Sequence, residues 1–147
     1  MTAKFPESDS RIEKYHDGFN VEYRSDGIII YHAYTATRDT IDAWFDVTVK
    51  HDQEHLAMGR HIRRIIYMHG NILPTPYTLA RAREADARTP DGLRESAAIV
   101  VDHILTYRLL AVFVNRLPGH AQSVVRVFSG MEGAVAWLDE RLRQLGE

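Results

Sequence analysis

Two histidines stand four residues apart in the segment His51-Asp52-Gln53-Glu54-His55. On a helix both imidazoles would lie on one face, which is the spacing that presents two nitrogen ligands to a divalent metal. The helical zinc-protease motif requires glutamate directly after the first histidine, and Asp52 takes that position here. No third ligand can be named. Because His51 and His55 also continue the margin of an apolar helix face, we predict boundary residues and no metal, with these two as the candidates if one binds.

Other residue patterns that carry chemistry are missing from the sequence. The 147 residues include no cysteine, which excludes disulfides, thiolate zinc sites and a cysteine nucleophile. We find no Gly-x-Ser-x-Gly elbow, no phosphate-binding glycine loop and no dinucleotide fingerprint. We therefore predict that the protein is not an enzyme and uses no cofactor.

The composition is that of an ordinary globular domain, with 45% hydrophobic residues, 26% charged residues and a net charge of −2. The polar N-terminus lacks the apolar core of a secretory signal, and no apolar run is long enough for a membrane span, so we expect a cytoplasmic protein. The segment 60–94 holds seven arginines against three acids. A basic segment can attract phosphates or an acidic partner. Since no nucleic-acid-binding motif accompanies it, we interpret it as a solvated surface and expect no nucleic-acid partner.

Hydrophobic patterning predicts a flexible tail over residues 1–17 and a single domain over 18–147. Residues 19–24 alternate apolar and polar side chains, as expected of an edge strand with one solvated face. Residues 28–34 are apolar on both faces, as expected of an interior strand, and Asp26-Gly27 is a turn pair between the two. The domain therefore opens with a β-hairpin.

Helices and strands alternate after the hairpin. Four helices and three strands are expected, over residues 38–58, 62–68, 76–88, 96–101, 103–117, 123–128 and from about 130 to the end. Their expected N-caps are Thr37, Thr75, Asp102 and Ser129. Because no breaker separates 96–101 from 103–117, one long helix over 93–117 remains the alternative. The order predicts an α/β fold with a mixed five-stranded sheet, the antiparallel hairpin preceding parallel strands, and about four helices.

The helix expected over 103–117 is apolar around nearly its whole circumference, and packing against one sheet cannot bury all of it. A second subunit, a small apolar ligand or a neighbouring helix must cover the rest. We expect a homodimer first, because two-fold dimers are the commonest oligomers. The candidate dimer or ligand surface comprises Ile104, Tyr107, Leu110, Phe113 and Val114. If a ligand binds instead, the tyrosines Tyr31, Tyr34, Tyr67 and Tyr77 are candidates to line its pocket.

The element order over residues 18–146 resembles the STAS-like domains, the group around bacterial anti-sigma-factor antagonists and their SEC14-like relatives. Two short patterns strengthen the resemblance: the segment 98–103 leading into the apolar helix, and Val127-Phe128-Ser129 followed by Glu132 and Ala136-Trp137-Leu138. The resemblance implies a non-catalytic regulatory or protein-interaction module. The SEC14-like relatives imply the alternative, a carrier or sensor of a small apolar ligand. A small enzyme without a recognisable motif is the weakest alternative.

One departure from that group concerns its regulatory residue. In phosphorylatable members an Asp-Ser pair precedes the helix that follows the second parallel strand. Residues 68–78 contain no such pair here, and Thr75, followed by Pro76, is the nearest hydroxyl. Because a helix N-terminus favours an anion, Thr75 and Thr78 are candidate phospho-acceptors. The simpler interpretation is that Thr75 is only an N-cap, so partner switching by phosphorylation is not expected in its usual form.

Overall fold

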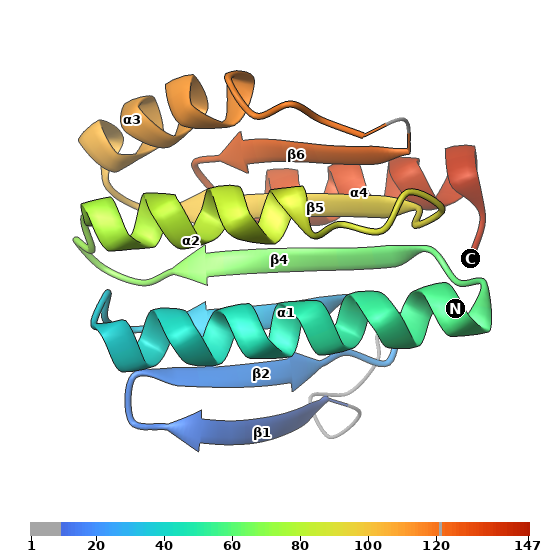
Figure 1. Cartoon of the computed structure of the whole chain (residues 1–147), viewed down its shortest axis with the longest axis horizontal. Helices are drawn as coiled ribbons and strands as arrows, with labels where there is room; N and C mark the ends of the chain where they lie inside the picture. The colour runs from blue at the N-terminus through green and yellow to red at the C-terminus, as the bar shows by residue number, and fades with distance from the viewer. Residues whose placement is uncertain (1–9, 121) are drawn as a thin grey trace.

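The computed structural model describes residues 10–120 and 122–147. These residues form an α/β domain in which six strands and four helices alternate after an N-terminal antiparallel meander (Figure 1). The elements are β1 (Arg11–His16), β2 (Phe19–Tyr23), β3 (Ile29–Ala33), α1 (Arg38–Met58), β4 (Ile62–Met68), α2 (Pro76–Ala87), β5 (Glu95–Val101), α3 (Ile104–Asn115), β6 (Ser123–Phe128) and α4 (Met131–Leu145).

The strands follow their chain order across one sheet, β1-β2-β3-β4-β5-β6. Pairing is antiparallel from β1 to β3 and parallel from β3 to β6. The crossover helices α1, α2 and α3 lie on one face of the sheet, and α4 covers the other face behind β4, β5 and β6 (Figure 1). Right-handed crossovers that all step the same way place their helices on one face. The predicted α/β class, with its antiparallel opening and parallel continuation, is therefore confirmed.

The sheet has one strand more than predicted, because β1 forms within the stretch expected to be a tail. That expectation is wrong from Arg11 onward, and residues 1–9 lie outside the described residues. The signal was weak because β1 is an edge strand whose side chains are mostly exposed, so main-chain pairing with β2 holds it without an apolar face. Consequently β2 is an interior strand and not the predicted edge.

Most element bounds match the prediction, with corrections at two helix starts. Residues 93–117 form a strand and a separate helix, so the single long helix is excluded. The N-cap of α3 is His103, not Asp102, and that of α4 is Gly130, not Ser129; neither cap has a side-chain hydrogen bond. No helix in the described part of the chain is both long and apolar enough to cross a membrane.

The helix α2 lies between α1 and α3 on one face of the sheet, and its Leu79 packs against the core around Met68 and Val101 (Figure 1). It packs mainly against α1, and neither the strands below it nor α3 approach it as closely. Its attachment uses Asp42 of α1, which accepts a hydrogen bond from the Tyr77 hydroxyl and lies 3.5 Å from Arg81 Nε. The Arg81 guanidinium also lies 3.7 Å above the Phe45 ring of α1. Two small cavities remain between α2 and the sheet.

Candidate ligand-binding site

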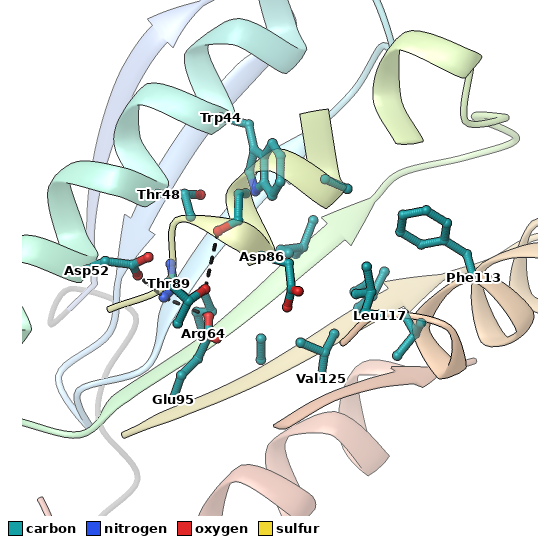
Figure 2. Close-up of a pocket in the computed structure, with 16 residues that line it drawn as sticks. Trp44, Thr48, Asp52, Arg64, Asp86, Thr89, Glu95, Phe113, Leu117 and Val125 are labelled. Carbon is teal, nitrogen blue, oxygen red and sulfur yellow. Dashed lines mark hydrogen bonds and ion pairs between the residues drawn. The ribbon is translucent and has the colours of Figure 1, made fainter. Parts of the chain in front are cut away.

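Two adjoining cavities occupy the space beneath α2. The polar cavity, of about 70 Å³, contains the side chains of Thr48, Asp52, Arg64, Asp86 and Glu95 in its lining (Figure 2). The apolar cavity, of about 80 Å³, is lined by residues that include Tyr31, Ile41, Met68 and Leu110. The two share the lining residues Trp44, Ile66, Ala82, Ile99 and Phe113. Each cavity has about half of the roughly 150 Å³ of an engineered cavity that admits a benzene ring, so a guest of that size would need both.

A buried ion cluster closes one end of the polar cavity (Figure 2). The Arg64 side chain, from β4, is only 1% exposed; its Nη2 pairs with Asp52 of α1 and lies 2.8 Å from Glu95 Oε2 of β5. Burial alone would lower the pKa of Arg64, but Glu95, Tyr31 and Asp52 raise it overall, so the guanidinium stays charged. Burial also raises the pKa of Asp52, although Arg64 opposes that change. One cation is thus shared by two carboxyl groups.

Four side chains around the polar cavity carry a buried polar atom without a hydrogen-bond partner among the described residues. These atoms are Trp44 Nε1, Thr48 Oγ1, Arg64 Nε and Asp86 Oδ2. Burial raises the pKa of Asp86, and His120 Nε2 lies 3.9 Å from its Oδ2, beyond hydrogen-bond reach. Buried polar groups are nearly always paired, and each unmade bond costs about 1–3 kcal/mol. An acceptor on a small guest would pair with Trp44 Nε1 or Arg64 Nε, and a donor would pair with Asp86 Oδ2.

His51 lies beside the ion cluster and is held by two tyrosines. Its Nδ1 is 2.7 Å from the Tyr31 hydroxyl, and its Nε2 is 2.9 Å from the Tyr23 hydroxyl. Burial lowers the pKa of His51 to about 4, and Arg64 adds to that effect. His55 donates from Nδ1 to the His51 carbonyl, at 2.8 Å. The structure therefore does not bring His51 and His55 to a shared metal position, and no group of three metal-ligating side chains occurs in the described residues.

Thr75 and Thr78 bind each other at the start of α2. Thr75 Oγ1 accepts from the Thr78 amide at 3.1 Å, and the Thr75 amide donates to Thr78 Oγ1 at 3.2 Å. This capping box confirms Thr75 as the predicted N-cap. Thr78 also lines the apolar cavity. Phosphorylation of either residue remains a prediction.

The five residues expected to share a dimer or ligand surface lie in different environments. Leu110 is buried against the core around Met68. Phe113 and Val114 line the polar cavity. Tyr107 is half-buried, and Ile104 is 59% exposed. The apolar side chains that α3 leaves exposed are Ile104, Leu105, Leu109 and Val112, of which the sequence analysis singled out only the first.

The four tyrosines proposed as pocket residues do not form one cluster either. Tyr31 lines the apolar cavity, whereas the Tyr77 hydroxyl donates to Asp42 at the α1–α2 contact. Tyr34 and Tyr67 both stack on His69, with ring centroids 4.4 and 3.8 Å apart. Tyr67 lies on the α4 face of the sheet, so this stack and the cavities are on opposite faces.

A chain of hydrogen bonds links that stack to β2. Glu22 Oε1 is 2.9 Å from His32 Nε2, and His32 Nδ1 is 2.8 Å from His69 Nε2. Because a carboxylate only accepts, His32 donates from Nε2 to Glu22, and one proton is shared between His32 Nδ1 and His69 Nε2. Burial and the neighbouring His32 lower the pKa of His69. The sequence analysis missed this group because its members are scattered over three segments.

The sequence analysis also missed the ion cluster. The interpretation of segment 60–94 as a solvated arginine-rich surface is wrong for Arg63 and Arg64, which are 6% and 1% exposed. A signal was present in the strand Ile62–Met68. Arg64 is two residues from both Ile62 and Ile66, so its side chain lies on the same face of the strand as theirs. An arginine on the helix-covered face of an interior strand needs a carboxylate partner.

Comparisons with protein-family models, curated proteins and solved structures find no significant match.

Proposed function

We propose that this chain is a non-catalytic regulatory module of STAS-like type that senses a small, largely apolar ligand beneath α2. The observation that carries the proposal is the group of four unpartnered polar atoms around a cavity that apolar side chains and the ion cluster line together. Protein interiors are close-packed, and stability alone would favour filling this space and pairing or removing those groups. A bound ligand gives them partners.

Binding is the chemistry that the cavity side chains suit. Arg64 is held by two carboxyl groups, and both ring nitrogens of His51 are engaged by tyrosines. These groups fix a charge distribution around a guest and have no orientation toward a shared reacting atom. This supports a sensor or carrier over the small-enzyme alternative.

The attachment of α2 supports a regulatory role for the ligand. Because α2 packs mainly on α1, a guest between α2 and the sheet would change how α2 sits. A protein partner that contacts the start of α2, around Thr75, would then respond to the ligand. Phosphorylation of Thr75 or Thr78 would add charge at the same place and belongs to the same proposal.

Phenol is a suitable first probe because it is one apolar ring with a hydroxyl that donates and accepts. We expect phenol to raise the melting temperature of the wild-type protein and to change the Trp44 fluorescence. Ala82 lines both cavities, so Ala82→Leu should abolish both responses. Ala80 is on the same helix but exposed, so Ala80→Leu is the matched control and should respond as the wild type does. Equal responses in all three proteins would contradict the proposal.

A homodimer through α3 is the second candidate. It is favoured by the exposed apolar row Ile104, Leu105, Leu109 and Val112. Native mass spectrometry should then show a dimer that Leu105→Glu converts to a monomer, while Arg108→Glu, exposed on the same helix, leaves it intact. A monomeric wild-type protein would exclude this candidate.

A further inference from the structure

A surface groove between α2 and α3 adjoins the two cavities. This α2–α3 groove has a volume of about 350 Å³, and its lining includes Leu79, Leu109, Val112 and Leu117. Phe113 lines the groove and both cavities. The groove therefore adjoins the two cavities, and Phe113 forms part of the wall of all three.

The groove leaves aliphatic side chains in contact with water. Leu109 is 44% exposed and Val112 is 51% exposed, although both line it. Removing apolar surface from water contributes about 25 cal/mol per Å². An apolar chain lying in the groove would cover these residues, and its end could pass Phe113 toward the cavities.

Two arginines from different helices line the same groove. Arg83 belongs to α2 and Arg116 is the C-cap of α3; both are exposed, and neither has a carboxylate within 4.0 Å in the described part of the chain. The Arg83 guanidinium lies 5.3 Å over the Phe113 ring. The helix dipole stabilises a cation at the C-terminal end of α3, which by itself favours arginine at position 116. This dipole effect does not act on Arg83, which lies in the middle of α2.

One carboxyl group shares the groove lining, and its position limits its effect. The Asp86 side chain is only 9% exposed, and His120 faces it at 3.9 Å. Burial raises the pKa of Asp86, and the neighbouring His120 opposes that change. Two exposed guanidinium groups therefore dominate the charge at the groove mouth and favour an anion.

We infer that the ligand is an amphipathic anion, with its apolar body in the groove and cavities and its carboxylate or phosphate head between Arg83 and Arg116. This inference rests on the proposed function, because it uses the same cavities. Arginine suits such a head because its guanidinium donates two parallel hydrogen bonds to a carboxylate or phosphate.

Three probes with the same ten-carbon chain separate the head group from the chain: decanoate, decanol and decyltrimethylammonium, each used below its micelle-forming concentration. Binding is read from the Trp44 fluorescence in a Trp137→Phe background, since Trp137 packs beside Phe128 on the other face of the sheet. We expect decanoate to bind most tightly and the ammonium compound least tightly.

Arginine variants locate the head group. Arg83→Gln and Arg116→Gln should each weaken decanoate binding by about tenfold, as expected for the loss of one charge-assisted contact, and leave decanol binding unchanged. Arg108→Gln is the matched control, because Arg108 is exposed on α3 and does not line the groove. Repeating the decanoate series with decyl phosphate tells which anionic head is preferred.

Any of three outcomes would overturn the inference. If decanoate and decanol bind equally well, or if both arginine variants keep the decanoate affinity of the control, the anionic head is wrong while the cavity proposal stands. If none of the ten-carbon probes binds although phenol does, the groove is not part of the site. A lack of response to phenol as well would instead remove the proposed function.

Discussion

Thr48→Val tests whether the polar cavity is built for a ligand at the expense of stability. The Thr48 side chain is buried in α1, and its hydroxyl has no hydrogen-bond partner among the described residues. Valine has nearly the same shape, so the substitution removes an unpaired hydroxyl and leaves the packing unchanged. An unpaired hydroxyl in an apolar site costs about 1–3 kcal/mol, so the free energy of unfolding should rise by about 1 kcal/mol or more. At this chain length that is roughly 2–4 °C in melting temperature.

Urea denaturation of the ligand-free protein measures the change, and Thr106→Val is the matched control. The Thr106 side chain is also buried, but its hydroxyl donates to the Ile72 carbonyl at 3.1 Å. Its replacement should lower the free energy of unfolding by about 1 kcal/mol. If Thr48→Val destabilises the protein as much as Thr106→Val does, the Thr48 hydroxyl already has a partner and the reasoning fails. If it stabilises, phenol binding should weaken in the same variant.

Three further substitutions test the surroundings of the site. Burial lowers the pKa of His51 from 6.5 to about 4, so on acidification the unfolded chain binds this proton before the folded protein does. The free energy of unfolding should therefore fall between pH 6.5 and pH 4, by about 3 kcal/mol at most. If His51→Gln shows the same pH dependence in urea denaturation, this expectation is wrong. Arg64→Met leaves two buried carboxyl groups without their cation, so it should cost about 3–5 kcal/mol, whereas exposed Arg60→Met should stay within about 0.5 kcal/mol in the same assay. Thr75→Ala removes the capping box and should cost about 1 kcal/mol, which Thr75→Ser should largely restore; identical losses in both variants would contradict the capping role.

Local sequence signals were sufficient for most of the fold. The helix Arg38–Met58 has a strong N-cap at Thr37 and a left-handed Gly59 at its end, so both of its bounds could be predicted. The strand Arg11–His16 could not, because its stability comes from pairing with β2 and its side chains carry no apolar period. The starts of α3 and α4 were misplaced by one residue because Asp102 and Ser129 have the right residue type for a cap but do not make the bond.

The site was harder to predict because it is assembled from distant segments. Arg64, Asp52 and Glu95 come from β4, α1 and β5, and only the parallel register places them together. The sequence did indicate that α3 has more apolar surface than one sheet can cover, and Phe113 and Val114 do face the polar cavity. What the pattern could not show is that cavities remain beneath α2, since that depends on packing between helices.

The attachment of α2 also has a kinetic consequence. Asp42 contacts both Tyr77 and Arg81, so much of the polar bonding between α1 and α2 converges on one carboxylate. A helix held chiefly along one side can detach by local opening without unfolding the sheet. Such an opening would give a ligand a second route to the cavities beside the α2–α3 groove, for release as well as entry. Changes at Asp42 would then alter how fast the site fills and empties, while changes at Thr48 or Arg83 act on the contacts that hold the guest.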